Sequence, residues 1–191
     1  HFGGVSCDMD SIIQIAEKHK LKVIEDCAQS LGAKYKGKAT GSFGDVACFS
    51  LIKNGYGIGG GILATNSEKI FKAASTIKKK YNNSSKIITG YRIIRNILES
   101  KRKYFIGSVL YNALIFIKGN TKNYTTITDQ LKKISPMTMK IAAYQINRFN
   151  ILHKLRKSQG SKYFDLLNNI GAQINNEFIK EDSSFTKYFL Y

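Results

Sequence analysis

Two short segments near the start of the chain carry side chains that can do chemistry. Asp26 ends an apolar run, and Gln29 follows shortly after it. Lys53 follows a second apolar run, residues 46–52, which contains the hydroxyl of Ser50. A lysine at the end of a buried strand is partly desolvated, which favours its neutral, nucleophilic form. The residue types therefore predict an amine nucleophile, a carboxylate and hydroxyl donors in one site.

These groups are the ones that a pyridoxal 5'-phosphate (PLP) site takes from its protein. Such a site needs an amine for the cofactor aldehyde, an acid beside the pyridine nitrogen and donors around the phosphate. Lys53 can supply the amine, Asp26 the acid and Gln29 a contact to the ring hydroxyl. Ser50 and nearby loop amides can bind phosphate, and the glycines of 55–61 let backbone approach a ligand closely.

Each of these residues also has an ordinary structural explanation. Asp26 could cap a turn, Lys53 could be a surface lysine, and the glycines could close a hairpin. The pattern Gly55-x-Gly57-x-x-Gly60 matches the dinucleotide-binding motif, but that motif opens a helix, whereas a strand-like segment follows here. The dinucleotide interpretation is therefore excluded. Spacing alone leaves the PLP site and the structural explanations open.

Hydrophobic periodicity predicts the elements that position these residues. The expected elements are a helix capped by Asp8 or Asp10, strands at 21–24, 45–51 and 61–65, and a helix from Ser67 to about Lys80. In the first helix, one face is expected to carry Ile12, Ile15, Ala16 and His19. The acid Asp26 then follows a strand, at the sheet edge where open α/β sheets build ligand sites.

The rest of the chain reads as helical. Residues 91–118 predict one or two helices, and the apolar part 104–117 is expected to be a core or dimer helix, with shallow membrane-surface contact as the alternative. After the polar connection 120–129, Ser135-Pro136 is typical of a helix start. A long helix should follow, with an apolar stripe and a break near Gly160-Ser161. The stripe comprises Met137, Ile141, Tyr144, Phe149 and Leu152.

The composition is that of a strongly basic globular chain. It has 191 residues, of which 30 are Lys or Arg and 13 are Asp or Glu, so the net charge is +17. Such a charge attracts polyanions and anionic surfaces, but the basic residues are also expected on solvated helix faces. No run reaches the ~20 apolar residues that span a bilayer. Because the chain opens on His1 without Met and ends on an apolar tail, we expect it to be truncated at both ends.

The cysteines predict free thiols rather than a disulfide framework. Cys7, Cys27 and Cys48 are odd in number and widely spaced, which is typical of a reduced, cytoplasmic protein. No zinc-ligand spacing is present, so we predict no metal site.

Ordered motifs give a more specific indication than spacing. The chain resembles the DegT/DnrJ/StrS-type sugar aminotransferases in four consecutive segments: His1-Phe2-Gly3-Gly4, Asp8-Met9-Asp10, residues 23–33 (VIEDCAQSLGA) and residues 41–50 (GSFGDVACFS). The resemblance is dense over 1–80 and resumes at Ile134-Ser135-Pro136 through Leu167.

The resemblance implies an α/β fold and an enzymatic function. It implies part of the fold-type I large domain over 1–80, a helical segment with a family-variable insertion over 81–134, and a long helix with the start of the small domain over 135–191. It further implies a cytoplasmic homodimer that uses PLP to transfer an amino group, usually from glutamate, to a nucleotide-linked keto sugar for polysaccharide, glycan or antibiotic synthesis. Lys53 would be the Schiff-base lysine, Asp26 the partner of the pyridine nitrogen, Gln29 the ring-hydroxyl contact and Ser50 a phosphate ligand.

The sequence departs from the family pattern at two places. The family has more residues between the phosphate-binding serine and the lysine than the Leu51-Ile52 seen here, and Leu131-Lys132-Lys133 replaces an asparagine and arginine that contact the dimer partner. Lys53 itself disfavours the dehydratase branch, which carries histidine there. The alternatives are an inactive truncated fragment, or a basic helical module for nucleic acid or membrane surfaces. No nucleic-acid partner is expected under the aminotransferase interpretation.

Overall fold

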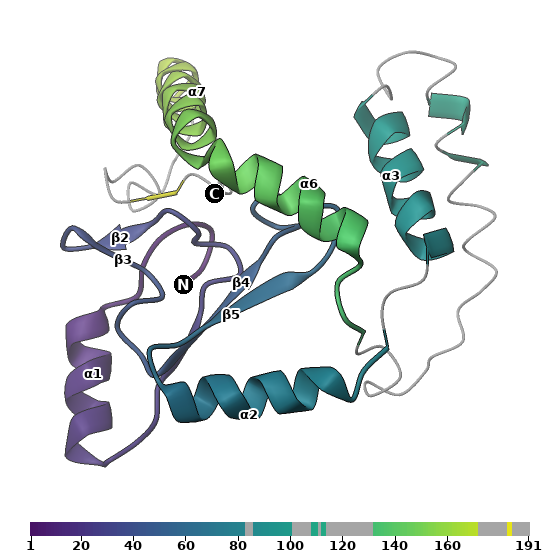
Figure 1. The fold of residues 1–191 in the computed structure, drawn as a ribbon. Helices are drawn as coiled ribbons and strands as arrows, with labels where there is room; N and C mark the ends of the chain where they lie inside the picture. The colour runs from purple at the N-terminus through teal and green to yellow at the C-terminus, as the bar shows by residue number, and fades with distance from the viewer. Residues whose placement is uncertain (83–85, 101–107, 111, 114–131, 172–182, 185–191) are drawn as a thin grey trace.

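The computed structural model describes residues 1–82, 86–100, 108–110, 112–113, 132–171 and 183–184 (Figure 1). In chain order, the elements with labels are α1 (Met9–Lys18), β1 (Ile24–Asp26), β2 (Lys34–Tyr35), β3 (Lys38–Ala39), β4 (Val46–Ser50), β5 (Gly61–Ala64), α2 (Glu68–Lys79), α3 (Lys86–Ser100), α6 (Pro136–Asn147) and α7 (Phe149–Asn169). The predicted α/β class is confirmed. The predicted domain boundaries at 80 and 134 stay a prediction.

A small mixed sheet organises the first part of the chain. Its strand order is β1-β4-β5, with β1 parallel to β4 and β4 antiparallel to β5. A separate hairpin joins β2 to β3 through Lys36 and Gly37, which both have positive φ (49° and 79°). Two such residues favour a tight hairpin turn. The sequence does not predict this hairpin, because its strands are too short to show an alternating pattern.

The first strand begins later than predicted. Residues 21–23 precede β1, which starts at Ile24. Val23 donates its N–H to the Asp45 carboxylate over 2.9 Å, and its carbonyl accepts the Asp45 N–H over 2.9 Å. Because a side chain rather than a neighbouring strand takes the Val23 N–H, the ladder starts one residue further on. The predicted strands at 45–51 and 61–65 are confirmed as β4 and β5.

The predicted helix starts are confirmed. The side chains of Asp8, Ser67 and Ser135 each accept a backbone N–H of the first turn of α1, α2 and α6. The face of α1 that carries Ile12, Ile15 and Ala16 is only partly buried, however. Ala16 is buried together with Met9, whereas Ile12 and Ile15 are 39% and 56% exposed. The rest of the protein therefore covers only a narrow stripe of α1.

The helical break in the last third lies earlier than predicted. Arg148 separates α6 from α7 with φ −97° and ψ 12°, and α7 continues through the buried Gly160. The expected apolar stripe is only partly buried, since Met137 and Tyr144 are 52% and 61% exposed. Thr138 and Ala142 are the buried residues of α6. Small side chains at these two positions let α6 lie close to the segment that joins β4 to β5.

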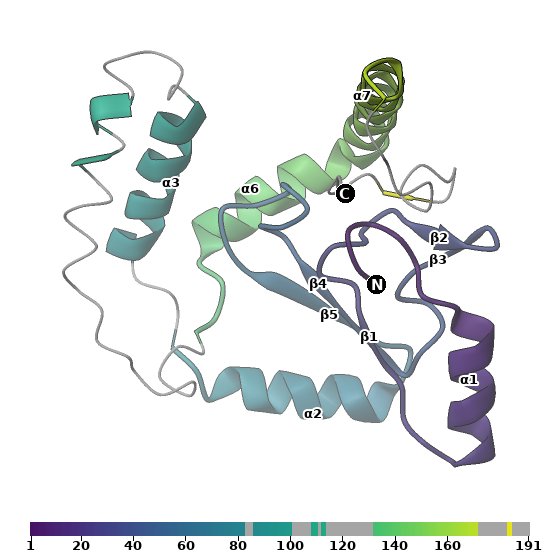
Figure 2. The same ribbon diagram turned by 180° about the vertical axis from the view of Figure 1, so that it is seen from behind.

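The main buried cluster lies between the end of the sheet and helices α6 and α7. Leu51, Tyr56 and Ala142 form its centre, and Leu31, Ile134, Phe149 and Leu152 pack around them. Helix α6 lies against the turn that joins β4 to β5, while α2 lies on the other side of the sheet from α6 (Figures 1 and 2). This cluster therefore supports the turn that carries Lys53, because Leu51 and Tyr56 flank Lys53 in the sequence.

Much of the segment 101–131 lies outside the described residues. The expectation of a core or surface helix at 104–117 concerns this segment, of which residues 108–110 and 112–113 are helical. The polar connection expected at 120–129 lies outside the described residues altogether. Among the helices that the structure describes, none combines the length and hydropathy that a membrane crossing requires.

Candidate functional site

The sheet brings the predicted site residues to one edge. Asp26 is the last residue of β1 and Ser50 the last of β4, and Lys53 lies in the turn that follows β4. β1 and β4 are parallel neighbours in which Asp26 pairs with Cys48. Their carboxyl ends therefore meet at the same edge of the sheet, the usual position of a ligand site in an α/β fold.

Asp26 and Gln29 belong to the loop that leaves β1. The exposed Asp26 carboxylate accepts the Ala28 N–H at Oδ1 over 2.9 Å, and Oδ2 has no hydrogen bond to another described residue. The half-buried Gln29 accepts the Gly3 N–H at Oε1 over 3.2 Å. Asp26 thus caps its own turn with one oxygen and presents a second one, while the Gln29 amide nitrogen is the group that can donate to a ligand.

Ser50 and Lys53 are joined within one tight turn. The Ser50 hydroxyl accepts the Lys53 N–H over 3.2 Å, and Gly55 donates its N–H to the Ile52 carbonyl over 2.9 Å. Only two residues separate Ser50 from Lys53, so the hydroxyl can cap the turn. Contrary to the prediction of partial burial, Lys53 is exposed. The chain has left the sheet by this point, and the next residue, Asn54, is buried instead.

The backbone amides of this turn are engaged within the protein. The N–H groups of 53–57 donate to Ser50 Oγ or to the carbonyls of Ser50, Leu51 and Ile52. The expectation that these amides bind phosphate is therefore wrong for residues 53–57, because the compact turn uses them. The Ser50 hydroxyl keeps its own proton as a donor.

The glycines after Lys53 pack against protein. A side chain at Gly57 would lie 3.6 Å from Ala142 Cβ, and one at Gly60 would lie 2.7 Å from Ile134 Cδ1. A side chain at Gly59 would lie 2.5 Å from the Arg92 guanidinium. These glycines thus let α3, Ile134 and α6 approach the turn, rather than opening the backbone to a ligand. The exclusion of a dinucleotide motif is confirmed, because strand β5 follows the glycines.

Asn54 is a residue that the sequence analysis missed. It is fully buried, and its amide nitrogen donates to the carbonyls of Ala28 and Ser50 over 2.9 and 2.7 Å. Its side-chain oxygen accepts the Leu31 N–H over 3.3 Å. The local signal is only an asparagine in a turn, which is ordinary. Its partners in the loop after β1 become visible only in the folded chain.

Glu25 is a second buried polar residue beside the site. Its carboxylate accepts the N–H groups of Gly41, Phe43 and Gly44 over 2.7, 2.7 and 2.6 Å, and lies 3.0 Å from His1 Nε2. His1 Nδ1 accepts the Cys7 N–H over 3.1 Å, so Nε2 carries the proton and donates to Glu25. Glu25 therefore ties the loop that leads into β4 to the strand that ends in Asp26.

The same residues form a group that superficially resembles a metal site. Ligand atoms of His1, Glu25 and Cys27 lie within 4.8 Å of one another. However, the carboxylate oxygens already accept hydrogen bonds, and burial raises the pKa of the Cys27 thiol to about 11, with the Glu25 charge adding to the shift. A protonated thiol and a donating imidazole nitrogen are poor metal ligands. The hydrogen-bond network accounts for this group.

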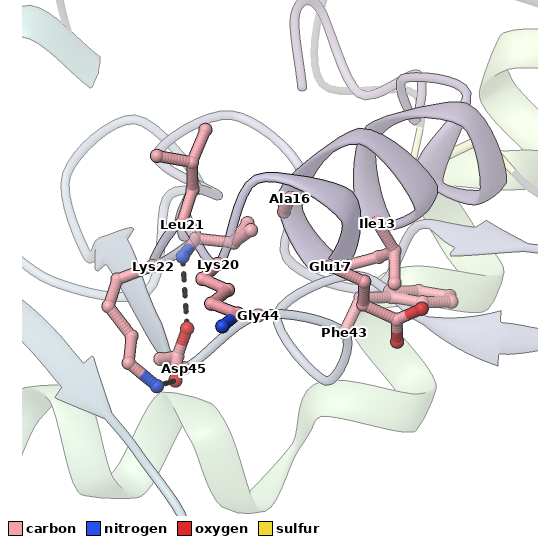
Figure 3. Close-up of a pocket in the computed structure, with 10 residues that line it drawn as sticks. Ile13, Ala16, Glu17, Lys20, Leu21, Lys22, Phe43, Gly44 and Asp45 are labelled. Atoms are coloured by element: carbon pink, nitrogen blue, oxygen red, sulfur yellow. Dashed lines mark hydrogen bonds and ion pairs between the residues drawn. The ribbon is translucent and has the colours of Figure 1, made fainter.

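A cavity of about 500 Å³ lies away from the predicted site. It is bounded by the second half of α1, residues 20–23 and residues 43–45 (Figure 3). Lys22 pairs with Asp45 over 2.8 Å at this cavity, and the Lys22 ammonium lowers the pKa of Asp45. None of Asp26, Gln29, Ser50 and Lys53 lines it. The cavity is therefore distinct from the sheet edge that carries the chemical groups.

The fold of the chain is similar to that of solved aminotransferases. Solved structures show this likeness over the whole chain: an aminotransferase from Psychrobacter cryohalolentis superposes with a TM-score of 0.62 at 20% identity, covering 100% of this chain and 45% of that one. A DegT DnrJ EryC1 StrS aminotransferase from Brucella abortus gives 0.54 at 17% identity, covering 98% and 41%. At these identities the likeness establishes the fold.

The sequence relatives place the chain more narrowly. Residues 1–92 match the model of the DegT/DnrJ/EryC1/StrS aminotransferase family. It is 47% identical over 91 residues to a dTDP-3-amino-3,6-dideoxy-alpha-D-galactopyranose transaminase of Aneurinibacillus thermoaerophilus, covering 44% of this chain and 25% of the relative. It is 42% identical over 76 residues to a GDP-perosamine synthase of Escherichia coli O157:H7, covering 37% and 20%. The chain thus spans a quarter or less of these curated relatives.

Proposed function

We propose that this chain provides the lysine-bearing part of a PLP-dependent aminotransferase that acts on a nucleotide-linked keto sugar. The observation that carries the proposal is the meeting of β1 and β4, which brings Asp26, Ser50 and Lys53 to one sheet edge within the family segment. The donor set fits the cofactor, because a carboxylate oxygen, a hydroxyl and a primary amine are available there. The amides of 53–57 contribute nothing to this fit.

Each assigned residue has a defined role under this proposal. When bound, PLP would supply the electron sink that stabilises negative charge at the substrate carbon. Asp26 Oδ2 would hold the proton of the ring nitrogen, the Gln29 amide would donate to the ring hydroxyl, and the Ser50 hydroxyl would donate to the phosphate. Lys53 would have two roles: its exposed amine would hold the cofactor and, once free, would act as the base that moves a proton at the substrate carbon.

The substrate class follows from the relatives. Their names describe a dTDP-amino sugar transaminase, a GDP-perosamine synthase and a UDP-N-acetyl-3-dehydro-alpha-D-glucosamine 3-aminotransferase. These enzymes share a sugar linked to a nucleoside diphosphate and an amino group on the sugar. We therefore propose transamination of such a sugar, with an amino acid, expected to be glutamate, as the donor. A homodimer and a cytoplasmic location, compatible with the free thiols, belong to the same proposal.

The covalent role of Lys53 is tested directly with the 191-residue chain. We expect that incubation with PLP followed by borohydride reduction attaches the cofactor at Lys53, as located by peptide mass mapping. Borohydride makes the bond permanent, so weak retention of PLP by this chain does not obscure the result. Lys53→Ala should lose at least about nine-tenths of the label, because the nucleophile is gone.

The control is Lys69→Ala, which removes an exposed lysine of α2 away from the site. It should retain the label at position 53. Label that persists in Lys53→Ala at the wild-type level, or that spreads evenly over the exposed lysines of the wild type, would refute the assignment. Turnover is then measured with a panel of nucleotide-linked keto sugars and an amino-acid donor.

A further inference from the structure

We infer that Asn54 is the positioning residue of the candidate cofactor site, and that Arg156 of α7 fixes it in place. The inference rests on the proposed function for the identity of the site. It rests on contacts of the described residues for the geometry. Asn54 does not touch the reacting groups; it sets where Lys53 lies relative to the loop that carries Asp26 and Gln29.

The Asn54 side chain links two segments that are far apart in sequence. Its amide donates to the Ala28 carbonyl on one side and to the Ser50 carbonyl on the other, over 2.9 and 2.7 Å. Its oxygen accepts the Leu31 N–H over 3.3 Å. Both amide protons are thus used, and the side chain has no contact with solvent. A buried amide that is satisfied in this way fixes its partners strongly, because breaking a bond leaves a buried polar group unpaired.

The linked residues flank the chemical groups. Ala28 and Leu31 stand on either side of Gln29, and Ser50 and Asn54 stand on either side of Lys53. A shift of the Asn54 amide therefore moves the loop after β1 relative to the lysine turn. Catalytic groups lose about a hundredfold in rate for a displacement of ~1 Å, so this distance matters for any reaction at Lys53.

Arg156 holds the backbone of the same residue from the other side. Its Nη2 donates to the Asn54 carbonyl, and its guanidinium lies 4.9 Å from the centre of the Tyr56 ring. Tyr56 is fully buried and stacks on Phe149 of α7 with ring centres 5.7 Å apart. Helix α7 therefore clamps the turn through one hydrogen bond and one cation–π contact.

Substitutions can separate positioning from folding. Asn54→Asp keeps the shape of the side chain. It replaces the amide group that donates to two carbonyl oxygens by a carboxylate oxygen that can only accept, so the two loops should move apart. Asn147→Asp makes the same chemical change at an exposed position of α6 and serves as the matched control. Arg156→Met keeps much of the volume without the hydrogen bond, while Arg156→Lys keeps the charge and a donor.

The experiment measures PLP attachment at Lys53 in the 191-residue chain as a function of pH, with circular dichroism to confirm folding. We expect Asn54→Asp to slow attachment about ten- to a hundredfold and to shift its pH profile. Arg156→Met should slow it by a smaller factor, and Arg156→Lys should restore part of the wild-type rate. Asn147→Asp should match the wild type in rate and pH profile.

The possible failures are distinguishable. If the wild type itself does not attach PLP at Lys53, the proposed function fails. If the wild type attaches PLP, and folded Asn54→Asp shows the same rate and profile, the positioning inference fails while the function stands. Should Asn54→Asp not fold, the pair at Arg156 decides: equal rates for Arg156→Met and the wild type would overturn the inference.

Discussion

At the scale of single residues, two buried polar side chains tie together the segments that carry the candidate site. Asn54 joins the loop after β1 to the lysine turn, and Glu25 joins β1 to the loop before β4. Neither is among the groups assigned to the cofactor, yet each lies next to one in sequence: Glu25 precedes Asp26 and Asn54 follows Lys53. The residues proposed to bind the cofactor are exposed or half-buried, and their neighbours Glu25 and Asn54 are buried.

Glu25→Gln tests this division at the acid side of the site. The amide can accept only at one oxygen, so its NH₂ group must face backbone N–H donors that the carboxylate now accepts. We expect a loss of roughly 1–3 kcal/mol in the free energy of unfolding, measured by urea denaturation. Glu17→Gln on the exposed surface of α1 is the control and should change little. An unchanged unfolding midpoint in Glu25→Gln would contradict the importance of this network.

The sequence predicted part of the site for a simple reason. Strand ends are visible in a hydrophobic pattern, so the convergence of Asp26 and Ser50 could be expected from two apolar runs. The exposure of Lys53 could not, because it depends on where the chain turns away from the sheet. The clamp on Asn54 was invisible as well, since Arg156 is 102 residues away in the sequence.

At the scale of elements, α7 acts through a stripe of three side chains. Phe149, His153 and Arg156 recur at helical spacing and face the loop containing Gly32 and the turn containing Tyr56. The His153 ring stacks on Phe149 with ring centres 5.3 Å apart. Burial lowers the pKa of His153, and the charges of Lys157, Arg156 and Lys34 add to the effect. Phe149 and His153 therefore present an aromatic surface beside the contact that Arg156 makes with the turn.

Gly32→Ala tests the contact between α7 and the loop after β1. Gly32 has φ +95°, and a Cβ atom there would lie 2.8 Å from Phe149 Cζ and 3.0 Å from the His153 ring. Gly37→Ala is a matched control, because φ is +79° but no atom lies within 4 Å. We expect about 1–2 kcal/mol of strain in both variants and about 1–3 kcal/mol more in Gly32→Ala, by urea denaturation. Equal losses in the two variants would mean that α7 does not press on this loop.

Elements were predicted well where their signals are local. Asp8, Ser67 and Ser135 act through the first turn of their own helices, so sequence alone suffices to place them. The late start of β1 was missed because Val23 bonds to the side chain of Asp45, a contact across more than twenty residues. The continuity of α7 through Gly160 was missed because glycine is only a weak breaker when its neighbours pack.

At the scale of the whole molecule, the chain exposes much apolar surface. Helix α2 buries none of its residues, and Phe71 and Ile77 are 61% and 54% exposed. A cavity of about 320 Å³ opens between β5, the end of α2 and residues 132–133, with Leu63 and Ile77 among its lining residues. Apolar surface of this kind on one face marks a site of association. The mixed sheet also ends in β5 on this side.

We therefore expect the 191-residue chain to bind the dye ANS and to associate as its concentration rises, as measured by fluorescence and light scattering. Ile77→Glu should reduce dye binding by roughly half or more, because it places a charge in the cavity. Lys69→Glu on the same helix is the control, since it changes the charge by an even larger amount at a residue that does not line the cavity. Absence of dye binding by the wild type would show that this surface is covered.

The contact between Arg156 and Asn54 also has a consequence for the order of events during synthesis. The turn that carries Lys53 leaves the ribosome long before its clamp, because 102 residues separate the two partners. At about 5–20 residues per second, the delay is on the order of 5–20 seconds. The antiparallel strands β4 and β5 are joined by a short connection, so they can pair within this interval. A nascent chain therefore contains the lysine turn well before α7 exists to restrain it.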